Sequence, residues 1–310
     1  MAEEQVDLKA YKAIDTMCRP FYCDTQVAKS LFEHYEYQVM AKTTFAGVLK
    51  RFNLKPGEEW KLLDNLGKSS IPGMLAEMDE IGVEFVFMDQ MIMWSWREHR
   101  VIAPCSLEDL ARLNKGSGGR IIGGVGYNPL RIKESLEDVE RAVKEYGFKY
   151  IWFHPTSFGL PFDDKKCYQL YMKCIELGVP CCMQVGHSAE PLPSWLGHPM
   201  QADEVALDFP ELTLVLTHTG WPWIAEWISM VWKHPNVYGN IGAYYPSALD
   251  PSIVQFIDGR GRSKVMWGTN GLGLTRCKKE LLQLPIREEA KKALLWDNAI
   301  KVFKLEDMVK

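Results

Sequence analysis

The sequence has 310 residues, of which 47% are hydrophobic and 25% charged, a composition that excludes disordered, fibrous and membrane-spanning classes and fits one large globular domain or two modest ones. Lys plus Arg number 36 and Asp plus Glu number 40, so the formal net charge is −4. This slightly acidic balance gives no indication of a nucleic-acid partner.

The chain carries no recognisable membrane or secretion signal. No window approaches the roughly 18 consecutive apolar residues that a membrane span needs. The start, MAEEQVDLKAYK, lacks the basic-then-apolar layout of a signal peptide. The eight cysteines are scattered and form no CxxC pair, which disfavours a disulfide framework or a zinc ribbon. We therefore expect a cytoplasmic protein without a membrane partner.

Short apolar or β-branched runs recur along the chain and predict eight strands. In chain order they are 11–15, 83–88, 120–127, 150–154, 179–185, 212–217, 237–241 and 264–267.

Segments with helical periodicity separate most of these runs, which is the βα alternation of a parallel sheet with helices outside. Eight such units in a single domain spanning 1–310 predict an α/β fold, a (β/α)₈ TIM barrel. A doubly wound sheet is the alternative, although no GxGxxG follows the first strand. Residues 24–80 are predicted to form an insertion or cap after the first strand, with helices near 26–34 and 73–81. Residues 287–295 and 298–305 are predicted to form the closing helices.

Catalytic groups of such barrels lie at the C-terminal ends of the strands. Polar residues that end or closely follow a predicted strand are therefore the candidates. They are Arg19, Asp89, Asn128, His154, His187, His218, Tyr244 and Asn270.

Five motifs in the expected order carry a family resemblance: AIDTMCRPF, FHPTSFGLPFDD, QVGHS, LTHTGWPW and KVMWGTNG. The sequence from Ala13 onward resembles the amidohydrolase-related TIM barrels, which include aminocarboxymuconate semialdehyde decarboxylase, resorcylate-type decarboxylases, and pyrone and muconolactone hydrolases. The ending WDNAIKVFKL is similar to the closing helix of this family.

The resemblance implies a metal site whose ligands are mostly replaced here. The family's first-strand histidine pair falls on Met17 and Arg19, and its eighth-strand aspartate falls on Asn270. Only His187 remains at a ligand position. A thioether, a guanidinium and a carboxamide are poor substitutes for imidazoles and a carboxylate, and arginine repels a cation. We therefore expect no metal and no other cofactor, with a zinc-like ion as the alternative.

The resemblance assigns acid–base catalysis to His218, which matches the sixth-strand histidine of the family. His187 would share its proton or orient the substrate. Asp89 is a candidate general base or, alternatively, a helix cap. Arg19 offers a planar fork of donors for a substrate carboxylate or oxyanion. The alternative is a surface arginine in a degenerate barrel.

Substrate contacts are expected from several further residues. Asn270 would donate a hydrogen bond, and His154 would contact the substrate or only brace its loop. Trp221 and Tyr244 belong to an aromatic set that suits a flat or apolar substrate, with core packing as the alternative.

The sequence thus predicts a metal-independent enzyme that hydrolyses a lactone, a cyclic amide or an activated C–C bond of a small carboxylated cyclic or aromatic compound. A decarboxylase of an aromatic or muconate-type acid is the second hypothesis. A catalytically silent barrel that binds a ligand is the third. The only partner predicted is a small-molecule substrate, and homo-oligomerisation stays open.

Overall fold

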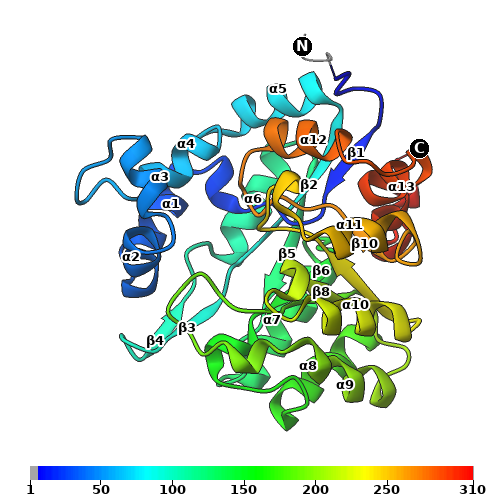
Figure 1. The fold of residues 1–310 in the computed structure, drawn as a ribbon. Coiled ribbons are helices and arrows are strands. Elements are labelled where there is room, and N and C mark those ends of the chain that lie inside the picture. The colour runs from blue at the N-terminus through cyan, green and yellow to red at the C-terminus, as the bar shows by residue number, and fades with distance from the viewer. Residues whose placement is uncertain (1–5, 310) are drawn as a thin grey trace.

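Eight parallel strands form the central sheet of the computed structural model, which describes residues 6–309 (Figure 1). Each predicted strand is present, and the spatial order follows the chain because a crossover links each strand to the next. The strands are β1 (Ala13–Asp15), β2 (Val83–Asp89), β5 (Ile121–Gly126), β6 (Tyr150–Phe153), β7 (Cys181–Gln184), β8 (Leu214–Thr217), β9 (Val237–Asn240) and β10 (Val265–Met266).

Backbone hydrogen bonds join the segment that follows β1 to the segment that follows β10. The N–H of Thr16 donates to the carbonyl of Trp267 at 3.0 Å, and the N–H of Thr269 donates to the carbonyl of Met17 at 3.2 Å. The buried carboxylate of Asp15 also accepts from the N–H of Thr269 at 3.0 Å. These contacts close the curled sheet, so the predicted (β/α)₈ barrel is confirmed.

Helices cover the outside of the barrel and bury one face each. In α7, for example, Ser135, Val139 and Ala142 are buried at helical spacing, while Arg141 pairs with Asp138 on the exposed side. The outer helices are α6 (Leu107–Gly116), α7 (Ile132–Lys144), α8 (Lys165–Leu177), α9 (Ala202–Asp208), α10 (Ile224–Lys233), α11 (Pro251–Asp258), α12 (Leu274–Leu282), α13 (Glu288–Lys292) and α14 (Asn298–Phe303).

Short polar side chains set several of the helix starts. The side chains of Ser106 and Asp164 accept hydrogen bonds from backbone N–H groups in the first turns of α6 and α8. Asp250 does the same for α11. Such caps satisfy N–H groups that the helix itself leaves unpaired. The helix starts are therefore encoded locally.

Five helices lie between β1 and β2, of which the sequence predicted two. They are α1 (Thr25–Phe32), α2 (Tyr35–Lys42), α3 (Ala46–Arg51), α4 (Lys61–Leu66) and α5 (Ile71–Ile81). Helix α5 packs against β2 and α12 as part of the barrel wall, whereas α1–α4 lie to one side of the strands (Figure 1). The predicted insertion 24–80 thus includes one barrel helix, and the role of its earlier part as a cap stays a prediction.

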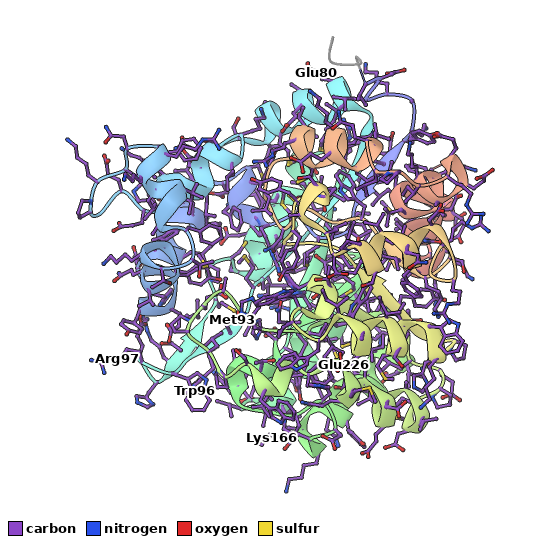
Figure 2. All side chains as sticks on the ribbon, viewed as in Figure 1. Glu80, Met93, Trp96, Arg97, Lys166 and Glu226 are labelled. Carbon is purple, nitrogen blue, oxygen red and sulfur yellow. The ribbon has the colours of Figure 1, made fainter. Side chains whose placement is uncertain are left out.

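A short antiparallel hairpin follows β2 and was not predicted. It consists of β3 (Met93–Ser95) and β4 (Arg100–Ile102). The hydroxyl of Ser95 donates to Glu36 of α2 at 2.8 Å, and the backbone N–H of Tyr35 donates to Glu98 at 2.9 Å. Figure 2 shows Met93 at the end of the hairpin nearer the barrel. The hairpin therefore ties α2 to the barrel rim.

All eight cysteines are buried and free, as expected for a chain whose cysteine spacing disfavours a disulfide framework. Within residues 6–309 the structure contains no helix with the length and apolar content of a membrane span.

Candidate active site

A cavity of about 390 Å³ opens at the C-terminal ends of the strands, where the fold predicts the active site. Six of the nine predicted site residues line it, from the segments after β1, β6, β7, β8, β9 and β10. They are Arg19, His154, His187, His218, Tyr244 and Asn270. Asp89, Asn128 and Trp221 lie outside the lining. The structure thus brings the first six together, while their chemical roles stay predictions.

Arg19 is fixed at the floor of this cavity. It is only 3% exposed, which excludes the surface-arginine alternative. Its Nη1 donates to both carboxylate oxygens of Asp89, at 2.8 and 2.9 Å, and its Nε donates to Oδ1 of Asn270 at 2.6 Å. The guanidinium also lies 4.4 Å from the ring centroid of Trp152, a cation–π contact. The orientation of the guanidinium is therefore set before any substrate arrives.

Asp89 acts in this structure as the anchor of Arg19. Besides the ion pair, its carboxylate accepts from the hydroxyl of Tyr150 at 3.2 Å and from the N–H of Met91 at 3.1 Å. Complete burial raises the pKa of Asp89, and the Arg19 charge opposes that shift. The next element is the hairpin strand β3, so Asp89 caps no helix. Its predicted role as a general base has no cavity contact to support it.

The hydrogen bonds of His218 define its tautomer. Its Nδ1 lies 2.9 Å from Oγ1 of Thr217. The single hydroxyl proton of Thr217 is already donated to the carbonyl of Met183 at 2.8 Å, so Oγ1 accepts from Nδ1–H of His218. Nε2 of His218 is then the unprotonated nitrogen.

Burial lowers the pKa of His218 well below 6.5, and the nearby charge of Arg19 adds to this effect. His218 is consequently neutral at physiological pH. A neutral imidazole with a lone pair on Nε2 is a proton acceptor.

His154 holds the opposite tautomer. Its Nδ1 accepts a hydrogen bond from the N–H of Ser157 at 3.1 Å, so its proton is on Nε2. Burial lowers the pKa of His154 to about 3, which keeps the ring neutral. The cavity therefore contains one neutral histidine that donates and another that accepts.

His187 is half-buried and belongs to the rim of the cavity. Its ring centroid lies 4.5 Å from that of Trp221, and its backbone N–H donates to the carbonyl of Trp221 at 2.9 Å. Burial lowers the pKa of His187, while Glu190 opposes the shift. Trp221 thus positions His187 from outside the cavity lining.

Sequence reasoning did not single out Gln184, Tyr37 or Glu190, all of which line the cavity. Gln184 ends β7, so its strand-end position was a usable signal. Tyr37 comes from α2 and is hydrogen bonded to Glu190 in the loop after β7; burial raises its pKa. Only the folded chain brings these two together, because they are remote in sequence.

Thr217→Val tests the tautomer assignment. The variant removes the acceptor that holds Nδ1–H of His218, so we expect kcat to fall by a factor of about 2 to 13, the equivalent of one hydrogen bond of about 0.5–1.5 kcal/mol. Thr217→Ser keeps the hydroxyl and is expected to retain wild-type kcat. Equal turnover in both variants would contradict the assignment.

A family model for amidohydrolases matches residues 98–305. The chain belongs to the amidohydrolase family. It is accordingly an enzyme, either a hydrolase or a carboxy-lyase. No curated protein matches the sequence.

Solved structures share the fold of this amidohydrolase at low sequence identity. An uncharacterised TIM-barrel protein from Bordetella bronchiseptica is 22% identical with a TM-score of 0.71, covering 94% of this chain and 98% of that chain. A 5-carboxyvanillate decarboxylase from Sphingomonas paucimobilis is 15% identical with a TM-score of 0.64, covering 95% and 99%. A dihydroxybenzoic acid decarboxylase from Polaromonas, with bound manganese and 2-nitroresorcinol, is 18% identical with a TM-score of 0.66, covering 95% and 97%.

The expectation of an enzyme without a cofactor is contradicted by these neighbours. The Polaromonas decarboxylase and a 5-carboxyvanillate decarboxylase from Novosphingobium aromaticivorans both contain manganese. Replacement of the usual ligands at the aligned positions does not by itself exclude a metal, because related barrels use one.

The side chains at those positions do not themselves fit a divalent ion. Met17 is buried with its methyl group against Gly242, Arg19 is cationic, and Asn270 is bonded to Arg19. Within residues 6–309 no group of three or more His, Cys, Asp or Glu is placed to hold a metal.

Proposed function

We propose that this amidohydrolase is a carboxy-lyase that replaces the carboxylate of a hydroxylated aromatic acid with a proton. The observation that carries the proposal is the pair of neutral histidines with opposite tautomers in a cavity rich in aromatic side chains. The aromatic-acid decarboxylases among the structural neighbours support the same choice. We therefore favour decarboxylation, the second hypothesis from the sequence, over hydrolysis, which was the first.

The lone pair on Nε2 of His218 would start the reaction. A ring hydroxyl of the substrate donates to Nε2, and His218 removes its proton. The resulting phenolate carries high electron density at the ring carbon that bears the carboxylate. His218, now an imidazolium, returns the proton to that carbon.

Loss of carbon dioxide completes the reaction. The bond between the ring and the carboxylate breaks, and its electron pair restores the aromatic ring. The ring oxygen leaves this step as a phenolate, because its proton has moved to the ring carbon, and it takes up one proton from solvent. The net change is therefore an aromatic carboxylate plus one proton converted to the arene and carbon dioxide. Nε2–H of His154 donates to a substrate oxygen throughout, and Arg19 with Asn270 holds the polar end of the ring near His218.

Turnover of a panel of hydroxybenzoates tests this function. The purified protein is incubated with each acid, both with added manganese and with a chelator, and the arene and carbon dioxide are quantified. We expect at least one acid to be decarboxylated. Hydrolysis of a lactone or cyclic amide without decarboxylation of any acid would instead support the activation of water by His218 and overturn the proposal.

A further inference from the structure

The cavity has two chemically different parts. Its polar side chains come mostly from the ends of the barrel strands, as described above. The side chains that α2–α4 and their connections add are mostly apolar. The apolar ones are Met40, Phe45, Val48, Leu62, Leu63 and Leu66, called here the apolar wall.

Apolar residues from outside α2–α4 also line the cavity. Phe21, Met91, Met93 and Leu272 also line it, with Met93 at the inner end of the hairpin (Figure 2). The hairpin holds α2 through Ser95 and Glu36, so the wall is attached at its edge. The apolar wall is therefore built by the segment that the chain inserts between β1 and the barrel helix α5 (Figure 1).

A hydroxylated aromatic acid with no further substituent on its ring would contact only the polar part of the cavity. Its hydroxyl and carboxylate need partners, and His154, His218, Arg19 and Asn270 supply them together. Cavities of about 300–1,000 Å³ hold ligands considerably larger than one ring, and 390 Å³ falls in this range. Water gains few hydrogen bonds against side chains such as Val48 and Leu63. The remaining volume thus favours an apolar group.

We propose that the substrate carries an apolar side chain of several carbons on its aromatic ring, and that the apolar wall binds this chain. The aromatic acid part of this statement rests on the proposed function, whereas the chain-binding part rests on the apolar wall alone. The inserted helices would then determine substrate specificity, while the barrel supplies the chemistry.

The proposal predicts how affinity depends on chain length. Each methylene buried against the wall should tighten binding about fourfold until the cavity is full. Dissociation constants are measured by calorimetry for hydroxybenzoates that carry a methyl, propyl or pentyl chain, with the chain placed in turn at each free ring position. For at least one ring position, we expect the constant to fall steadily from methyl to pentyl.

Two neighbouring substitutions on α3 provide a matched comparison. Val48→Phe fills part of the apolar wall, so the gain from methyl to pentyl should shrink to less than fourfold in total. Leu49→Phe makes a similar change on the same helix, but Leu49 is half-buried outside the cavity lining, and this variant should keep the wild-type dependence. Circular dichroism confirms that both variants are folded.

The outcomes separate the two proposals. Wild-type affinity that does not change with chain length at any ring position overturns the apolar wall as a binding site, even if the acids are decarboxylated and even if Val48→Phe does not fold. Chain-dependent binding without turnover supports the wall and overturns the carboxy-lyase assignment. An equal loss of the dependence in both α3 variants would also contradict the wall, because the effect would then come from the helix and not from the cavity.

Discussion

Replacing His218 with alanine is expected to lower kcat by about 100-fold or more, because general acid–base catalysis contributes at least this much. Affinity for the acid should change little, since other side chains hold the substrate oxygens. The measurement is kcat and the dissociation constant on an acid that the wild type converts. His198→Ala, a histidine outside the cavity lining, is the control and should keep wild-type kcat. Unchanged turnover in His218→Ala would remove the assignment.

The pH dependence follows from the same residue. The base form of His218 is required, and burial lowers its pKa well below 6.5. That form is therefore already dominant at pH 6.5, so kcat/KM should not fall between neutral pH and 6.5 and should fall only at lower pH. A fall in kcat/KM centred at pH 6.5, if it depends on His218, would mean that His218 is more solvated than the structure indicates.

Asp89→Ala is expected to destabilise the protein by about 3–5 kcal/mol, because it leaves the buried charge of Arg19 without its partner. The free energy of unfolding is measured by urea denaturation. The loss should exceed that of Tyr150→Phe, which removes only one hydrogen bond to the same carboxylate.

The double variant Arg19→Met with Asp89→Leu is the control for this prediction. It removes both charges at once, so its free energy of unfolding should be higher than that of Asp89→Ala and close to that of the wild type. Turnover should stay low, because the guanidinium beside His218 is gone. A destabilisation below about 1 kcal/mol in Asp89→Ala would show that water reaches the ion pair.

The strands were predictable because short apolar runs alternate with amphipathic helices along most of the chain. The rim was predictable for the same reason, since parallel strands bring their ends together and place Arg19, His154 and His218 at one edge. The α2–α4 helices were not. Helices α3 and α4 have six residues each, too few turns to establish a period, and the buried face of α2 includes the charged residue Glu36. The β3–β4 hairpin is likewise too short for a clear alternation.

The pairing of Arg19 with Asp89 could not be read from the sequence. Both were candidates, but they lie 70 residues apart, and only the barrel geometry brings the guanidinium onto that carboxylate. The tautomer of His218 shows the same limit. Thr217 is adjacent in sequence, yet the direction of its hydroxyl depends on the carbonyl of Met183 in the neighbouring strand. The sequence identifies these polar groups as candidates. The packing of the folded chain determines which of them exchange a proton and which only hold a neighbouring side chain in place.

The central claim is that a proton delivered by His218 takes the place of the carboxylate on the ring. The most direct test is turnover in heavy water, with the position of deuterium in the product determined by NMR. The account predicts one deuterium at the carbon that lost carbon dioxide, formed at a rate that His218→Ala lowers by about 100-fold or more. A product that keeps its carboxylate and has instead gained oxygen from water would contradict the account.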